Sequence, residues 1–216
     1  MNNSLTKRLN VLYNELKGGG VFADVGCDHG YVAEKAIENG LFEKVIISDI
    51  SEKCLKKAEE RLNERHKGEF TAIVSDGFDN LPSVNEAIVA GMGGEVMISM
   101  LERLNEKPQR LVLQPMKNAE KLREYLINGG YRLVRDYTFR DWKFYHVIVA
   151  EKSEENDVYT ADELIFGRDN LREKSDDFKA FVNEKIKLFT EAALNASDED
   201  REKLDEKVKR LRSVIE

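Results

Sequence analysis

The chain has 216 residues, of which 41% are hydrophobic, and this is enough for one domain of ordinary size plus a smaller segment. Its net charge is −7, and residues 151–216 hold 19 acidic and 13 basic residues, so most of the acidity lies in the last part of the chain. This balance excludes nucleic-acid binding by overall charge, and an RNA partner would need local basic patches.

The two cysteines, Cys27 and Cys54, exclude a disulfide framework and predict a reducing compartment. No N-terminal signal peptide and no membrane-spanning run is visible, so we expect a cytoplasmic protein without a membrane partner. The three histidines and two cysteines are too scattered to form a zinc site, and we expect no bound metal.

Apolar spacing predicts a first helix over residues 4–16, which Gly18-Gly19-Gly20 ends. Strands and helices then alternate, and such alternation predicts a parallel sheet with right-handed crossovers. The predicted strands are 21–25, 44–48, 70–74, 87–90 and 110–114, and the predicted helices are 31–39, 51–66, 95–104 and 119–128.

Residues 131–139 and 143–151 are rich in Val, Ile, Tyr and Phe and predict an antiparallel hairpin at the sheet edge. The resulting seven-stranded sheet resembles the Rossmann-like class I methyltransferase domain. We therefore expect an α/β methyltransferase domain over residues 1–151.

Residues 152–157 are predicted to form a linker to a helical segment over 152–216. Thr160 and Glu163 predict a capping box for a short helix that ends near Gly167. A longer helix is expected over 170–195 and a last helix after Ser197, each with one apolar stripe. A short connection between two amphipathic helices predicts an antiparallel coiled-coil hairpin.

The first strand is followed by Asp24-Val25-Gly26-Cys27-Asp28-His29-Gly30, which predicts a glycine turn between a strand and a helix. A dinucleotide fingerprint would need glycines where Asp28 and Tyr31 stand. Carboxylates beside glycines instead suit a ligand that carries positive charge and approaches the backbone closely. S-adenosylmethionine, with its sulfonium and amino group, fits this pattern.

Further unusual residues follow the other strands, at the edge where a doubly wound sheet binds its ligand. Asp49 is expected to accept hydrogen bonds from ribose hydroxyls, and Asp76 with Gly77 to meet an adenine ring, although Asp-Gly is also an ordinary turn. Three glycines in 90–94 predict close passage of a ligand or a tight bend. Gln114 either faces substrate or bonds to a neighbouring loop.

Asp-Val-Gly-Cys-Asp-His-Gly-Tyr, Ala-Gly-Met-Gly-Gly and Leu-Gln-Pro-Met, together with the two-helix tail, resemble the bacterial tRNA (adenine-22-N1)-methyltransferase family over essentially the whole chain. The resemblance implies methyl transfer from S-adenosylmethionine to N1 of an adenine in the D-arm region of tRNA. Asp28 is the candidate catalytic residue, with binding of the cofactor's ammonium as its competing role. The residues expected to bind the cofactor are Asp24, Gly26, Cys27, His29, Gly30, Asp49, Ile50, Asp76, Gly77, Ala90, Gly91, Met92 and Gly93.

RNA phosphates are expected to meet local clusters of basic residues, although a solvated helix face also explains those of the tail. The expected contacts are Lys7, Arg8, Arg132, Arg135, Arg140, Lys143, Lys203, Lys207 and Arg210. The expected partner is tRNA and not DNA, and the chain is expected to be a monomer or a weak homo-oligomer. Two alternatives stay open: a methyltransferase of small molecules or proteins, and a non-catalytic RNA-binding module.

Overall fold

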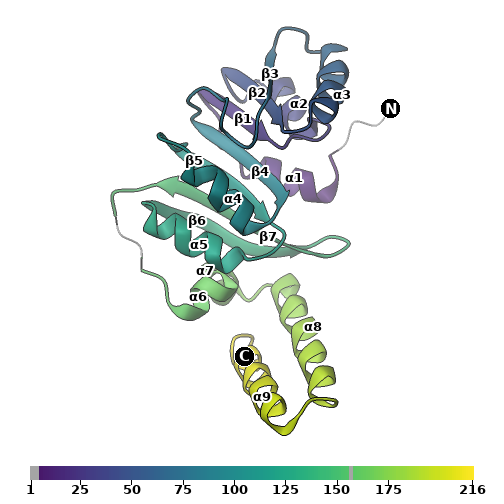
Figure 1. Cartoon of the computed structure of the whole chain (residues 1–216), viewed down its shortest axis with the longest axis vertical. Helices are drawn as coiled ribbons and strands as arrows, with labels where there is room; N and C mark the ends of the chain where they lie inside the picture. Colours follow the sequence, from purple (N-terminus) through teal and green to yellow (C-terminus); the bar gives the residue numbers. More distant parts are fainter. Residues whose placement is uncertain (1–4, 156–157) are drawn as a thin grey trace.

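The protein is described here by a computed structural model that covers residues 5–155 and 158–216. Its centre is a seven-stranded sheet with the order β3-β2-β1-β4-β5-β7-β6 (Figure 1). Every pairing is parallel except those of β7, which runs antiparallel to both β5 and β6. The predicted seven-stranded, mixed α/β sheet is thus confirmed. The strands are β1 (Val21–Val25), β2 (Lys44–Asp49), β3 (Phe70–Val74), β4 (Glu86–Met92), β5 (Arg110–Pro115), β6 (Tyr131–Arg140) and β7 (Phe144–Lys152).

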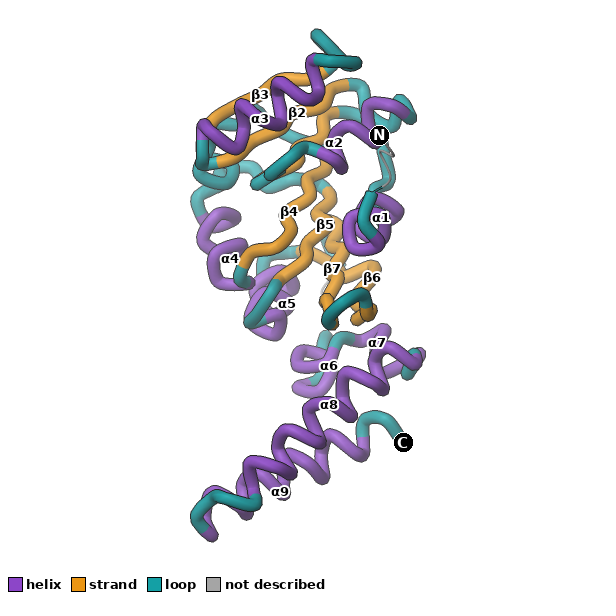
Figure 2. Tube along the Cα trace, turned by 90° about the vertical axis from the view of Figure 1, so that its right-hand side faces the viewer, coloured by secondary structure: helices purple, strands orange, loops and turns teal. Residues whose placement is uncertain are grey.

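Helices cover both faces of the sheet, as Figure 2 shows in the view turned by 90°. One face packs against α4 (Gly94–Glu102) and α5 (Ala119–Asn128), through buried residues such as Met97 and Leu122. The other face packs against α1 (Lys7–Asn14), α2 (Tyr31–Glu38) and α3 (Glu52–Asn63). Because both faces are covered, the central strands are continuous apolar runs, as in Val45-Ile46-Ile47.

Most predicted boundaries shift by one to three residues; the helix expected over 51–66, for example, ends at Asn63. The fourth strand was expected to end at Ala90, but β4 continues to Met92 with a register shift between Ala90 and Met92. Gly91, with φ +81°, provides this bulge, so the strand bends without ending. The first helix begins after its N-cap Thr6, and its expected start at position 4 lies outside the described residues.

The tail consists of α6 (Ala161–Phe166), α7 (Arg168–Glu173), α8 (Asp176–Ala193) and α9 (Asp198–Ser213). The capping box of Thr160 and Glu163 is confirmed. The single helix predicted over 170–195 is wrong, because Lys174 takes a left-handed conformation and Ser175 caps a new helix by accepting from the Phe178 N–H. The linker positions 156 and 157 lie outside the described residues.

The free edge of β6 explains why the helix breaks there. The backbone N–H groups of Asp136, Thr138 and Arg140 alternate along this edge and donate to side chains of the tail at 2.8–2.9 Å. The acceptors are Asp169 and Asn170 of α7 and Asp177 of α8. Side chains therefore replace a neighbouring strand, and α7 must turn to present them. Within the described residues, no helix is long and apolar enough to cross a membrane.

Candidate functional site

The candidate site lies where the sheet changes direction. β1 pairs with β2 on one side and with β4 on the other, so the chain leaves the carboxyl ends of β1 and β4 in opposite directions. Such a switch point opens a crevice at the carboxyl edge, and this crevice is the usual ligand site of doubly wound sheets. The glycine turn after β1 and the bulge of β4 meet there.

The turn after β1 is shaped by three left-handed residues. Gly26, Asp28 and Gly30 have φ values of +71°, +51° and +66°. The N–H groups of Gly26 and Cys27 both donate to the Ser48 carbonyl of β2, at 2.8 and 2.9 Å. Asp28 is the one of the three with a side chain, and that side chain is 78% exposed. The turn thus projects a carboxylate over the crevice.

Glycine is required at positions 26 and 30 for different reasons. A Cβ on Gly26 would overlap the Met92 side chain at the end of β4, so the absence of a side chain lets the turn after β1 contact the end of β4. A Cβ on Gly30 would meet Leu62 Cδ1 at 2.9 Å, on α3. Gly30 therefore allows α2 to pack on α3, whereas Gly26 shapes the crevice itself.

Three carboxylates gather around this turn. Asp24 is buried, and its Oδ2 accepts from the Ala33 N–H of α2 at 3.2 Å. Burial, followed by the charges of Asp28 and Asp49, raises the pKa of Asp24 to about 7. Burial and the same acids raise the pKa of the Cys27 thiol, so the thiol stays protonated. A cation bound here would relieve the mutual repulsion of these carboxylates.

The ends of β2 and β3 carry the other predicted side chains. Asp49 Oδ1 accepts from the Ser51 N–H at 2.8 Å, and Ser51 caps α3. Ile50 between them is 68% exposed. Asp76 is half exposed and forms an ion pair with Arg103 of α4 at 3.4 Å. Gly77 has φ +64° and lies where a Cβ would meet Met100, so packing alone explains that glycine.

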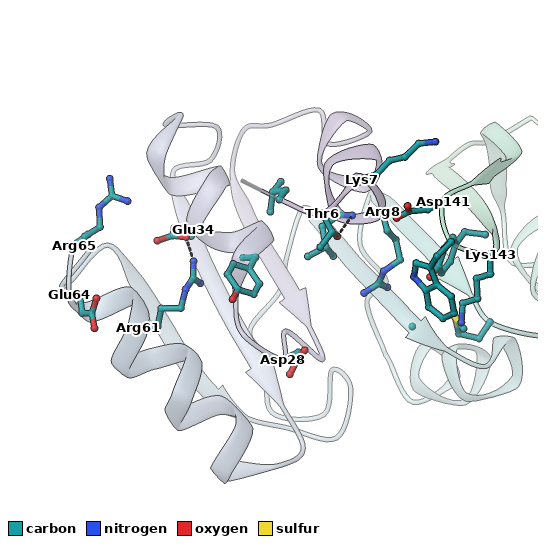
Figure 3. Close-up of a pocket in the computed structure, with 17 residues that line it drawn as sticks. Thr6, Lys7, Arg8, Asp28, Glu34, Arg61, Glu64, Arg65, Asp141 and Lys143 are labelled. Carbon is teal, nitrogen blue, oxygen red and sulfur yellow. Dashed lines mark hydrogen bonds and ion pairs between the residues drawn. The ribbon is translucent and has the colours of Figure 1, made fainter. Parts of the chain in front are cut away.

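A cavity of about 1300 Å³ opens in front of the turn. Asp28 and Gly91 are the predicted cofactor-site residues among its lining, whereas Asp49 and Asp76 end neighbouring strands outside it. Figure 3 shows two walls: Glu34 and Arg61 stand on the side of α2 and α3, and Arg8 and Lys143 stand on the opposite side. The cavity exceeds the roughly 1,000 Å³ of large small-molecule sites, so a substrate base has room beside the glycine turn.

Three of the lining residues that were not expected from the sequence are Tyr31, Arg61 and Trp142. Tyr31 begins α2 and carries the Arg61 guanidinium 4.0 Å from its ring centroid. Trp142, 75% exposed, lies in the link between β6 and β7, with Lys143 Nζ 4.3 Å from its ring. A lone tryptophan between basic residues of a hairpin is the signal that could have found this wall. Arg61 lies 31 positions after Gly30, and no local pattern pointed to it.

In the structure Gln114 takes the second of the two roles considered for it, a hydrogen bond to a neighbouring segment. Its side chain is fully buried, and Oε1 accepts from Arg8 Nη1 at 3.0 Å. Nε2 donates to the Pro115 carbonyl at 3.2 Å. In this structure Gln114 therefore bonds to its neighbours and holds Arg8 at the mouth of the cavity, beside Gly91.

The basic residues expected to meet RNA do not form one surface. Lys7, Arg8 and Lys143 line the cavity. Lys207 and Arg210 lie at a second cavity, between the sheet and the tail. The others engage acidic neighbours or the hairpin: Arg132 with Glu155, Arg135 with Asp169, Lys203 with Glu199, and Arg140 over Phe144.

His66 lies beside Glu34 and Glu38, with one potential ligand atom of each within 4.8 Å of the others. This proximity was not visible in the sequence. Arg61 pairs with Glu34, and Arg65 Nη1 lies 3.2 Å from Glu38 Oε1. The protein itself therefore balances the charge of both carboxylates.

Comparison with known proteins places this geometry in a family. The family described as tRNA (adenine(22)-N(1))-methyltransferase matches residues 22–216. A Mycoplasma pneumoniae protein, provisionally described as a tRNA methyltransferase, is 32% identical over 187 residues, covering 83% of this chain and 86% of its own. The tRNA (adenine(22)-N(1))-methyltransferase of Bacillus subtilis is 28% identical over 170 residues, covering 76% and 71%.

A solved structure supports the fold. The Streptococcus pneumoniae protein crystallised in complex with S-adenosyl-L-methionine superposes with a TM-score of 0.89 at 23% identity, covering 99% of this chain and 100% of that one. The seven-stranded Rossmann-like methyltransferase fold is therefore shared over the whole length. This chain belongs to the tRNA (adenine(22)-N(1))-methyltransferase family.

Proposed function

We propose that this chain transfers the methyl group of S-adenosylmethionine to N1 of adenine 22 in tRNA, as its family description states. The observation that carries the assignment to this crevice is the cluster of Asp24, Asp28 and Asp49 at the switch point, beside a cavity with room for a base. An anionic, glycine-lined edge suits a cationic cofactor, and the adjoining cavity suits a base turned out of the RNA stack.

The residues at the crevice fit S-adenosylmethionine. In our proposal the carboxylate of Asp49 accepts from the ribose hydroxyls and that of Asp76 from the adenine amino group. We further propose that the cofactor approaches the backbone closely at the turn from Gly26 to Gly30 and at the strand end from Ala90 to Gly93. The residues that pack around it are Cys27, His29, Ile50, Gly77 and Met92. When bound, the cofactor supplies an electrophilic methyl group on a sulfonium, beside the acids of the turn.

For this reaction the protein mainly has to position adenine N1 in line with the methyl group. Adenine N1 carries an in-plane lone pair, so it attacks the methyl carbon in line with the leaving sulfur without prior removal of a proton. Positive charge then develops on the adenine ring. The exposed carboxylate of Asp28 faces the cavity, and we assign it the stabilisation of this charge.

The walls of the cavity suit an unstacked adenine. Tyr31 and Trp142 offer aromatic faces on opposite sides, and Arg8 and Lys143 offer positive charge for the flanking phosphates. RNA bases outside a helix are commonly held by such aromatic and guanidinium planes. We therefore propose that these residues hold the target nucleotide.

The division into a methyltransferase domain over 1–151 and a helical domain over 152–216 is also part of our proposal. α8 and α9 bury Phe178, Val182 and Leu211 against each other, which supports a coiled-coil hairpin. The Leu164 carbonyl of α6 meanwhile accepts from Arg123 of α5, and the Asp169 side chain of α7 accepts from the backbone of β6. The chain is proposed to act as a monomer or weak homo-oligomer.

The test is a methyl-transfer assay with labelled S-adenosylmethionine and tRNA transcripts, followed by mapping of the modified nucleotide. We expect N1-methyladenosine at position 22 and loss of incorporation when adenine 22 is replaced by guanine. Incorporation at another nucleotide, or into small molecules or protein but not tRNA, would overturn the proposal. Calorimetry with the cofactor alone separates a failure of cofactor binding from a failure of substrate recognition.

A further inference from the structure

A second cavity, of about 650 Å³, lies between the sheet and the tail. Its lining includes Pro115 at the end of β5 and Met116 after it, Phe144 and His146 of β7, and residues of α8 and α9. Met116 and Lys143 line both this cavity and the larger one in front of the glycine turn. A ligand that spans the shared wall would therefore occupy both.

The charge of the second cavity differs from that of the tail around it. Among the described residues, its lining holds one acid, Glu120, against five bases: Lys117, Lys143, Lys185, Lys207 and Arg210. Arg210 is paired with Asp162, but the lysines leave a positive excess in a segment that is otherwise acidic. Such a local concentration of lysines attracts a polyanion.

The same cavity contains a cluster of aromatic rings. The Phe181 ring lies 5.5 Å from that of Phe144 and 5.2 Å from that of His146, both edge to face. Lys185 Nζ lies 4.9 Å from the centroid of Phe181, and Lys207 Nζ lies 5.7 Å from that of Phe189. Flexible lysines over ring faces can move aside for a planar base and then pair with its phosphate.

His146 contributes a neutral ring to this cluster. Its Nδ1 lies 3.0 Å from Thr138 Oγ1, and burial, with the charges of Arg123 and Lys185, lowers its pKa to about 3. The positive charge of the cavity therefore comes from lysine and arginine ends near the surface, while its interior stays uncharged. Apolar rings inside and cations at the mouth match the two parts of a nucleotide.

We infer that the second cavity binds an unpaired nucleotide of the tRNA other than the one that is methylated, with its base against Phe181 and Phe189 and its phosphate at Lys185 and Lys207. The volume lies within the range of about 300–1,000 Å³ usual for ligand sites. The inference rests on the proposed tRNA substrate and extends it, because it places a specificity contact beside the reacting base.

The charge part is tested with two matched double variants of the full chain. Lys185→Glu with Lys207→Glu reverses the cavity charges, whereas Lys187→Glu with Lys209→Glu makes the same changes on exposed positions of the same helices that do not line this cavity. We expect the first pair to raise the KM for tRNA by about tenfold and to flatten its salt dependence, and the second pair to change KM by less than about threefold. Equal effects of the two pairs would overturn the inference in favour of diffuse attraction.

The base-stacking part is tested by ultraviolet cross-linking of the parent protein to tRNA, with mass spectrometry of the cross-linked peptides. We expect a nucleotide attached to the α8 peptide that contains Phe181 or Phe189, and loss of this cross-link in Phe181→Leu, which keeps an apolar side chain. Thermal melting confirms that this variant folds. Cross-links confined to the first cavity would overturn the inference.

The two proposals fail in distinguishable ways. If the parent methylates adenine 22 and the Lys185→Glu, Lys207→Glu variant does so with unchanged KM, the second cavity has no role and the proposed function stands. If the parent does not methylate tRNA, the proposed function falls and this inference falls with it. Cofactor affinity, measured by calorimetry, is expected to be equal in all variants.

Discussion

At the scale of single residues, Gly26 shows how a backbone position shapes the crevice. Its φ of +71° favours glycine, and the space where a Cβ would stand is filled by the Met92 side chain of β4. The positive φ affects the free energy of the turn, and the filled Cβ position affects the distance between the turn after β1 and the end of β4. A substitution at Gly26 therefore changes both stability and the crevice.

Gly26→Ala is expected to destabilise the protein by about 1–2 kcal/mol through left-handed strain and to weaken cofactor binding further by pushing Met92 away. The matched control is Gly19→Ala, because Gly19 has φ +88° but nothing lies within 4 Å of its Cβ position. Urea unfolding and cofactor calorimetry measure the two effects. Equal loss of cofactor affinity in both variants would contradict the crevice role of Gly26.

Asp28 has φ +51°, a conformation that asparagine also tolerates. Asp28→Asn therefore keeps the backbone of the turn and removes only the charge. We expect the rate of tRNA methylation to fall by about 10- to 100-fold, with a smaller change in cofactor affinity, because the exposed carboxylate lines the cavity proposed for the reacting base. Single-turnover rates and calorimetry separate the two quantities. Unchanged rates would remove Asp28 from catalysis, and an equal fall in cofactor affinity would assign it to the ammonium.

Asp24 predicts a pH dependence of stability. Burial raises the pKa of Asp24 from 3.8 to about 7, so the folded state holds a proton that the unfolded state releases between these values. The stabilising contribution is complete below pH 3.8 and is lost as the pH rises through 7, with each pKa unit worth about 1.4 kcal/mol.

Asp24→Asn removes this titration while its side-chain oxygen still accepts from the Ala33 N–H. Without cofactor, we expect the variant to be more stable than the parent at pH 8 and the difference to shrink towards pH 5. Urea unfolding across this range measures it. A difference that does not vary with pH would show that Asp24 titrates normally.

At the scale of elements, one buried arginine joins α5, the edge strand β6 and the tail. Arg123 of α5 is fully buried, and its Nε donates to both carboxylate oxygens of Asp136 on β6 at 2.8 and 2.9 Å. Its Nη1 donates to the carbonyls of Leu164 and Ile165 in α6. One side chain thus orders a helix, an edge strand and the start of the tail.

Arg123→Met is expected to destabilise the protein by about 3–5 kcal/mol, because it leaves the Asp136 carboxylate buried without its partner. The double change Arg123→Met with Asp136→Leu should recover part of this loss, since no charge then remains buried. Chemical unfolding measures both variants. A loss below about 1 kcal/mol in the single variant would contradict the role of the pair.

At the scale of the whole molecule, the tail has two parts with different relations to the sheet. α6 and α7 supply polar groups to α5 and β6, whereas α8 contacts the edge of β6 at its start, through Asp177, and then extends away from the sheet with α9 (Figure 2). Stability and substrate binding are therefore expected to depend on different parts of the tail.

Two truncations distinguish these parts. A chain that ends at Lys152 loses Asp169 and Asn170, which pair the edge of β6, and we expect it to unfold at a lower urea concentration than a chain that ends at Lys174. The longer chain is expected to bind the cofactor but to lose affinity for tRNA, because it lacks Lys185 and Lys207. Calorimetry and filter binding measure these affinities. Equal urea midpoints for the two chains would contradict the assignment.

The amino-acid sequence by itself determined the order of the strands and helices, the parallel sheet with its antiparallel end, and the placing of Asp28, Asp49 and Asp76 after successive strands. These features follow from local periodicity and from the rule that parallel strands end at one edge. The local capping box of Thr160 with Glu163 was equally visible, because it involves residues only three apart.

Only the tertiary structure decided which of these groups meet. In the folded chain the helix breaks at Lys174, and α7 pairs the edge of β6. Gln114 bonds to Arg8. The residues Tyr31, Arg61 and Trp142 line one cavity. The physical reason is that these contacts join residues 30 to more than 100 positions apart. No periodicity records such pairings, since they depend on how the helices pack on the sheet.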